Sequence, residues 1–116
     1  DVRKRTISRP WGQEIVWAET NNYVGKILEV RANQQLSLQY HEIKEETLYV
    51  LEGDLTMTLG DRIWRIGPET VIHIPPKTIH RIFAWTDSKI LEVSTPRLDD
   101  VVRLSDDYGR ITDAKI

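Results

Sequence analysis

Residues 47–66 read TLYVLEGDLTMTLGDRIWRI, and this stretch indicates the fold class more clearly than any other. Apolar and polar residues alternate along three short runs, which is the pattern of β-strands with one buried face. Gly53 and the turn Leu59-Gly60-Asp61 separate the runs. The full set of alternating runs covers residues 14–19, 23–31, 36–41, 47–52, 54–59, 62–66, 70–74, 80–85 and 90–94. These short strands predict an all-β, antiparallel double-sheet barrel of the jelly-roll kind.

Length and composition restrict the function classes further. A chain of 116 residues predicts one domain, 1–116, and its lack of cysteine excludes disulfides, thiolate metal sites and thiol catalysis. The net charge of -2, without a basic run, argues against nucleic acid as a partner. No apolar run approaches the length of a membrane span, and no secretory signal is visible, so we expect no membrane and a cytoplasmic location. A helical period is weakly present only at residues 98–104.

The run 36–41, LSLQYH, has an unusual distribution of polar residues. One face would carry Ser37, Gln39 and His41, and the other Leu36, Leu38 and Tyr40. If the polar face points into the barrel, it lines a cavity, and the apolar face needs cover from a second subunit. This interpretation predicts a homodimer. The alternative is a strand with its apolar side inward and its polar side in water.

Four residues of this region and beyond have the side chains of a metal site. Gln39 and His41 leave one strand on the same side, Glu46 begins the next run, and His80 opens a later one. Two neutral imidazoles, one carboxylate and one amide oxygen can bind a divalent cation and leave room for water or substrate. We therefore expect these segments to converge on one side of adjacent strands.

The same residues resemble the cupin motifs. Gln39-x-His41-x4-Glu46-x6-Gly53 is similar to the first motif, with Gln in place of its first histidine, and Gly67 through Pro75 to His80 is similar to the second. The blocks RPWG (9–12), LSLQYH (36–41) and DDVVRLSDDYGR (99–110) narrow the resemblance to the C-terminal cupin domain of type II phosphomannose isomerases (mannose-6-phosphate isomerase).

The resemblance implies a fold, a cofactor and a reaction. The fold is the cupin double-stranded β-helix, a jelly-roll barrel. The metal is one divalent cation per chain, Zn²⁺ first, with Mn, Fe, Ni or Co as alternatives. The reaction is the interconversion of an aldose and a ketose, with mannose 6-phosphate and fructose 6-phosphate as the pair, so the expected partner is a small sugar or sugar phosphate.

Four further residues have expected roles in that reaction. An inward-facing Glu92 would move the proton between the two carbons, although an ion pair on the outer sheet is the alternative. Lys44 and Lys77 flank His41 and His80 and so are expected at the cavity mouth. Lys77 would stabilise the developing oxyanion, while Lys44 and Arg97 would bind the phosphate, unless these cations are ordinary surface residues.

Departures from the family pattern leave other functions open. Lys44 stands where the family usually has arginine, Thr47-Leu48 where it has a His-Trp pair, Lys77 where it has glycine and Ala84 where it has asparagine. One alternative is a non-catalytic cupin that binds a sugar or metabolite. The other is an oxidative Fe or Mn cupin, a dioxygenase, against which Gln39 argues because redox sites commonly use an imidazole there. The role of His73 stays open, because strand parity does not decide which way it faces.

Overall fold

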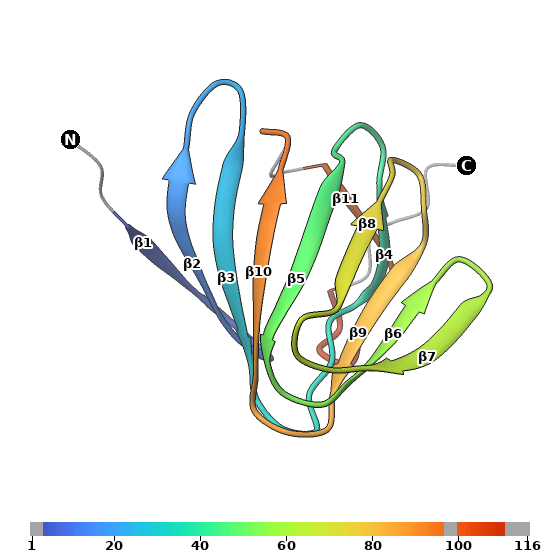
Figure 1. Ribbon diagram of the computed structural model, residues 1–116. Helices are drawn as coiled ribbons and strands as arrows, with labels where there is room; N and C mark the ends of the chain where they lie inside the picture. Colours follow the sequence, from blue (N-terminus) through green and yellow to red (C-terminus); the bar gives the residue numbers. More distant parts are fainter. Residues whose placement is uncertain (1–3, 97–99, 111–116) are drawn as a thin grey trace.

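Every regular element of the described residues, 4–96 and 100–110, is a β-strand in this computed structural model (Figure 1). A six-stranded antiparallel sheet, ordered β1-β2-β3-β10-β5-β8, contains β1 (Arg5–Arg9), β2 (Gly12–Glu19), β3 (Val24–Val30), β10 (Ser88–Ser94), β5 (Glu46–Glu52) and β8 (Val71–Ile74). A five-stranded antiparallel sheet, ordered β11-β4-β9-β6-β7, contains β11 (Val101–Ser105), β4 (Leu38–His41), β9 (His80–Ala84), β6 (Leu55–Leu59) and β7 (Arg62–Ile66). Sheet neighbours that are distant in sequence give the predicted jelly-roll topology.

All nine predicted strands are present, with ends that differ by at most two residues. The sequence analysis missed β1 and β11. The weak helical period at 98–104 is too short to predict a helix, and Val101–Ser105 within it pairs with β4 as a strand. None of the described residues lies in a helix that is long and apolar enough to cross a membrane.

The inward faces of four central strands change from apolar to charged within two residues. The change follows each strand toward the end of the barrel where the β4–β5 and β8–β9 connections lie (Figure 1). The buried pairs, with the apolar residue first, are Leu28 and Lys26 on β3, Leu48 and Glu46 on β5, Ile90 and Glu92 on β10, and Ile82 and His80 on β9. One end of the barrel therefore holds the hydrophobic core, and the other holds a charged interior.

The hydrophobic core fills the space between the two sheets at its own end. Val50, Leu55, Met57, Ile74 and Ile90 are each at most 1% exposed. Burial of a side chain of this size contributes about 1.5–3 kcal/mol relative to the exposed state. The core thus stabilises the barrel without help from the charged end.

The segment before β4 corrects one expectation. Ser37 and His41 are buried, as expected for an inward polar face. Leu36, however, packs against the hydrophobic core instead of facing outward with Leu38 and Tyr40. It precedes β4 in an irregular segment, where the alternation of strand side chains does not apply. Leu38 and Tyr40 are half-buried, so they do not form the exposed patch that the sequence predicted.

Candidate metal centre

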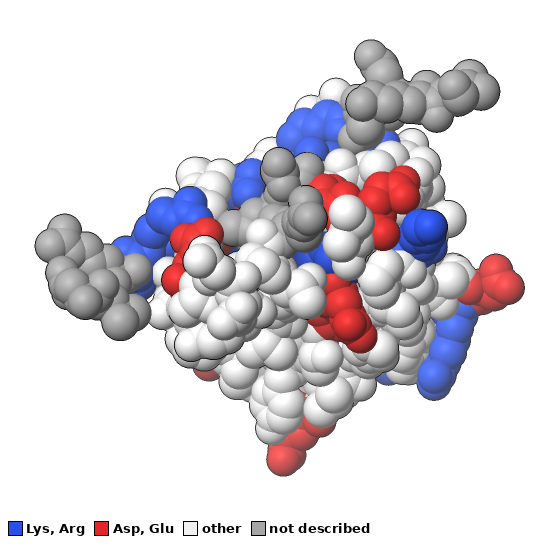
Figure 2. All heavy atoms as spheres, turned by 90° about the horizontal axis from the view of Figure 1, so that it is seen from above, with Lys and Arg blue, Asp and Glu red and all other residues white. Residues whose placement is uncertain are grey.

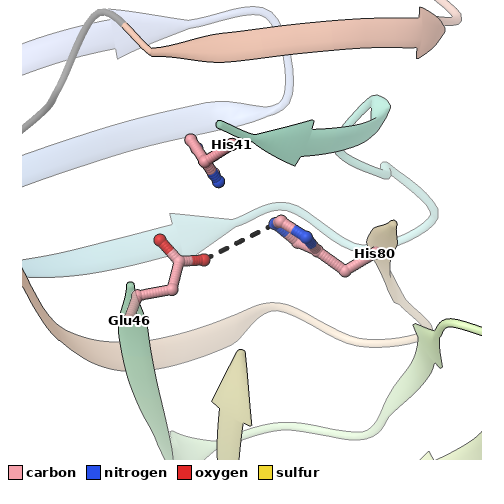
Figure 3. Close-up of side chains that lie close together, drawn as sticks. All are labelled: His41, Glu46 and His80. Atoms are coloured by element: carbon pink, nitrogen blue, oxygen red, sulfur yellow. Dashed lines mark ion pairs between the residues drawn. The ribbon is translucent and has the colours of Figure 1, made fainter. Parts of the chain in front are cut away.

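Three buried side chains from three strands meet at the charged end of the barrel (Figure 3). His41 ends β4, Glu46 begins β5 and His80 begins β9. One possible ligand atom from each residue lies within 4.8 Å of the others. The two imidazole rings stack with centroids 5.3 Å apart, and Nε2 of His80 lies 3.5 Å from Oε1 of Glu46. This cluster has the composition of a site for a divalent metal ion.

The surroundings of both imidazoles suit a metal ligand. Nδ1 of His80 lies 2.9 Å from the carbonyl oxygen of Thr78. A carbonyl only accepts, so Nδ1 carries the proton and Nε2 directs its lone pair into the cluster. Burial lowers the pKa of His41 to about 3, with repulsion by Lys44 and His80 adding to the effect, so its ring is neutral near pH 7. The cluster therefore fits a cation.

Gln39 reaches the edge of the cluster through its side-chain amide. Its backbone pairs with His80 across β4 and β9, and its Nε2 lies 3.5 Å from Nε2 of His80. Its Oε1 accepts a hydrogen bond of 2.6 Å from the Ser37 hydroxyl. A half-turn of the amide would direct Oε1 toward the cluster, and Ser37 could then accept from the amide nitrogen. Gln39 is thus placed to become a fourth ligand.

Lys44 lies inside the cavity and not at its mouth, which corrects the expectation from its position near His41. It is 4% exposed, and its Nζ lies 2.9 Å from Oε2 of Glu46 and 3.0 Å from Oε2 of Glu92. Burial acts to lower the pKa of Lys44, but the attraction of Glu92 and then of Glu46 outweighs it and raises the pKa. Lys44 is therefore a permanent cation between the two carboxylates.

Glu92 faces inward, so the alternative of an ion pair on the outer sheet is excluded. It is 3% exposed and lines the same cavity as the three clustered residues. Besides Lys44, its Oε2 lies 3.7 Å from Nζ of Lys26, which in turn lies 2.5 Å from Oε1 of Glu14. Because isolated charges are costly to bury, this alternation of cations and carboxylates is what keeps all of them in the interior.

Two other residues singled out in the sequence, Lys77 and His73, lie away from the cluster. Lys77 lies in an exposed turn with a φ of 63°, donates its backbone N–H to the carbonyl of His41 and is absent from the cavity lining. Arg97 lies outside the described residues. His73 is exposed and pairs with Glu45 at 2.6 Å, so it faces solvent.

Sequence reasoning missed several residues of the cavity wall. Arg9, Glu14, Lys26, Arg103 and Arg110 all line it. Two of them had a readable signal: Lys26 and Glu14 occupy inward positions of β3 and β2, between buried Val24 and Leu28 and beside buried Val16. A charge at an apolar position of an alternating strand indicates an interior ion pair or a cavity.

Comparison with known proteins agrees with this architecture. Residues 2–106 match the family described as "Mannose-6-phosphate isomerase C-terminal". The mannose-1-phosphate guanylyltransferase of Escherichia coli (strain K12) is 30% identical over 112 residues, which are 92% of this chain and 23% of that enzyme. The chain thus spans about a quarter of the length of the curated relatives it matches.

Two solved structures share the fold. KdgF from Halomonas sp. has a TM-score of 0.75 at 23% identity, over 86% of this chain and 89% of that one. An RmlC-like cupin from Shewanella frigidimarina NCIMB 400 has a TM-score of 0.75 at 13% identity, over 84% and 88%. At such identities the likeness shows the fold alone, a cupin barrel. Together with the match over residues 2–106, it establishes that the chain belongs to the mannose-6-phosphate isomerase C-terminal family of cupin domains.

Proposed function

We propose that this domain interconverts an aldose and a ketose that carry a phosphate group, with mannose 6-phosphate and fructose 6-phosphate as the pair. The observation that carries the proposal is Glu92, a buried carboxylate outside the metal cluster that lines the same cavity. Aldose–ketose isomerisation needs such a group, because a proton must leave one carbon and return to its neighbour. The family name and the sugar-phosphate relatives support the choice of substrate.

The cluster would hold one divalent cation, with Zn²⁺ as the proposed metal, through His41, Glu46 and His80, and through Gln39 after its amide turns. When bound, such a cation would polarise the carbonyl and hydroxyl oxygens of the open-chain sugar. Burial holds His41 in the neutral form that this role requires, and the hydrogen bond of His80 to Thr78 leaves Nε2 of His80 to face the cluster.

The chain's own groups would move the proton. Glu92 would take it from the carbon bearing the hydroxyl group and return it to the former carbonyl carbon, while the hydroxyl proton passes between the two oxygens. The product is the isomeric sugar, with no atom gained or lost. Lys44 would hold Glu92 in place through their ion pair of 3.0 Å, so it replaces Lys77 as the proposed cation beside the reaction.

The test is Glu92→Gln in the metal-loaded protein. We expect at least about a hundredfold loss of turnover, the usual scale for a general base, with the metal content unchanged. Production of fructose 6-phosphate from mannose 6-phosphate gives the rate, and deuterium from solvent should enter the carbon that receives the proton. Glu19→Gln is the matched control, because Glu19 is exposed and pairs with Arg5 away from the cavity. Full activity in Glu92→Gln would contradict the proposed role.

One observation favours a second function, the non-catalytic binding of a sugar phosphate. Oε2 of Glu92 is shared between Nζ of Lys44 and Nζ of Lys26, so both ion pairs occupy an oxygen that a general base would need. Binding of mannose 6-phosphate without interconversion of any aldose–ketose pair would establish this second function.

A cytoplasmic location stays a prediction, supported by the lack of cysteine in the 116 residues.

A further inference from the structure

The wall of the cavity concentrates positive charge in a chain whose net charge is -2. Its basic members outnumber its three carboxylates, Glu14, Glu46 and Glu92, by two to one. The six basic members are Arg9, Lys26, Lys44, Arg81, Arg103 and Arg110. The two lysines are matched by the three carboxylates through contacts of 2.5–3.7 Å, and Arg81 donates to the backbone carbonyls of Leu36 and Ser105. The other three basic members are arginines: Arg9 shares Glu14 with Lys26, Arg110 pairs with Asp106, and Arg103 lies on β11 next to β4 and lines the cavity.

Arg103 lies on the strand that pairs with β4, beside the metal cluster. It pairs with Gln39 across β11 and β4, and Val101 on the same strand pairs with His41. Side chains that face each other across paired strands project to the same side of the sheet, so Arg103 projects into the barrel beside Gln39. Its place in the cavity wall agrees with this register.

The guanidinium group of Arg103 is close enough to those of Arg110 and Arg9 to feel their charge. Burial lowers the pKa of Arg103, and Arg110 and Arg9 lower it further through their like charge, against the attraction of Asp106 and Glu14. Three arginines gathered at one wall of a cavity are stabilised by an anion bound between them. Arginine also matches the geometry of phosphate oxygens better than lysine does.

Arg9 and Arg110 are each held by a carboxylate. Arg9 donates from Nε to Glu14. Arg110 donates from Nε and Nη2 to the two oxygens of Asp106, each at 2.9 Å, and its backbone N–H adds a bond of 2.7 Å to Asp106. A guanidinium has five N–H donors, so each arginine keeps donors beyond those that its carboxylate uses. The groups are thus oriented before a ligand arrives.

We propose that Arg9, Arg103 and Arg110 form a subsite for the phosphate group of the sugar, while the cluster of His41, Glu46 and His80 faces its carbonyl end. The inference rests on the proposed function for the identity of the sugar. It assigns the phosphate to these arginines and not to Lys44, Lys77 or Arg97. A hexose 6-phosphate carries its phosphate at the opposite end of the carbon chain from the carbonyl. One such molecule can therefore contact the arginines with its phosphate and the metal cluster with its carbonyl end.

Calorimetric binding to the metal-loaded wild-type chain tests the subsite without any variant. The probes are mannose 6-phosphate, mannose, mannuronate and inorganic phosphate. We expect mannose 6-phosphate to bind at least tenfold more tightly than mannose or mannuronate, and inorganic phosphate to compete with it. Equal affinity for mannose and mannose 6-phosphate would overturn the subsite, and so would tightest binding of mannuronate, since the anion would then be a carboxylate.

Variants separate the subsite from the metal cluster and from catalysis. Arg103→Gln should weaken mannose 6-phosphate binding at least tenfold, leave mannose binding unchanged and keep the metal content. Arg103→Lys should restore part of the affinity. Arg65→Gln is the matched control, because Arg65 is exposed and pairs with Asp54 away from the cavity. An equal loss for both sugars in Arg103→Gln would contradict the subsite.

Turnover distinguishes the two proposals. Selective binding of the phosphorylated sugar without isomerisation would support the subsite and reject the proposed reaction. Isomerisation of mannose and mannose 6-phosphate with equal kcat/KM would support the reaction and reject the subsite.

Discussion

At the scale of single residues, the chain contains its own control for the metal cluster. Its three histidines divide into two that are buried in the cluster and one, His73, that is exposed and paired with Glu45. We expect His41→Ala to lose nearly all bound metal, because an apolar methyl group cannot replace an imidazole ligand. His73→Ala should keep one metal ion per chain. Elemental analysis of protein purified without added metal gives both numbers, and circular dichroism checks that the barrel still folds.

The same measurement identifies the metal. Zinc would support isomerisation, whereas iron or manganese with dioxygen uptake would favour the oxidative alternative. Full metal content in His41→Ala would mean that the three clustered residues are not the ligands.

Whether a site residue could be placed from the sequence depended on whether its burial follows from its own strand or from distant partners. The pattern of Gln39, His41, Glu46 and His80 could be predicted because strand parity and residue type point to the same conclusion. The place of Lys44 could not, since it lies outside any strand and its burial depends on two carboxylates, of which Glu92 is distant in sequence. Sequence alone does not show that such partners meet, so a solvated lysine was a reasonable alternative.

At the scale of elements, Asp100 ties the start of β11 to the turn between β4 and β5. Its Oδ2 accepts from the backbone N–H groups of Ile43 and Lys44 at 2.6 and 2.9 Å. This turn carries the chain from His41 to Glu46. Burial acts to raise the pKa of Asp100, but these backbone hydrogen bonds outweigh it and lower the pKa.

Asp100→Asn should therefore lower the free energy of unfolding at pH 7 by about 1 kcal/mol, a modest loss because the carboxylate is close to solvent. The advantage of the wild type is present above the ordinary pKa of an aspartate, near 4, and disappears as the pH falls through the lower native value. Urea unfolding of the metal-free proteins between pH 7 and pH 3 measures it. Asp61→Asn, in an exposed turn, should show no such difference. A gap between Asp100→Asn and the wild type that grows toward low pH would contradict the explanation.

The strands that the sequence missed share a physical reason with the cavity. β11 presents Val101 and Arg103 inward, and β1 contains a single apolar residue, Ile7, so neither shows an apolar alternation. A strand next to a polar cavity lacks the signal that identifies a strand over a hydrophobic core. The other nine strands could be predicted because part of each faces the hydrophobic core and shows the apolar alternation.

At the scale of the whole molecule, an apolar row crosses the outer face of the six-stranded sheet. Its members are directly opposite one another on β2, β3, β10, β5 and β8. They are Ile15, Ile27, Leu91, Tyr49 and Val71. Tyr49 is 37% exposed and Val71 60% exposed. We propose that a second copy covers this row, in place of the Leu36, Leu38 and Tyr40 face predicted from the sequence.

A sheet face can pair with itself about a two-fold axis, and a stable dimer of this kind would bury about 800 Å² on each partner. Light scattering at micromolar concentration should give a dimer for the wild type and a monomer for Tyr49→Lys. Ile63→Lys, on β7 of the other sheet, should remain dimeric. A monomeric wild type would reject the homodimer.

Figure 2 looks down on the charged end of the barrel and shows Lys and Arg side chains beside Asp and Glu side chains there. Each of β3, β5, β9 and β10 has buried apolar residues toward one end of the barrel and a buried polar residue of the cavity toward the other. A substitution in the cavity can therefore change ligand preference without touching the hydrophobic core. Replacing a cavity pair such as Glu14 and Lys26 with apolar residues of similar volume would raise the free energy of unfolding and abolish activity. Selection for thermal stability alone would thus favour loss of the cavity's charged residues, and with them the function, while the fold is kept.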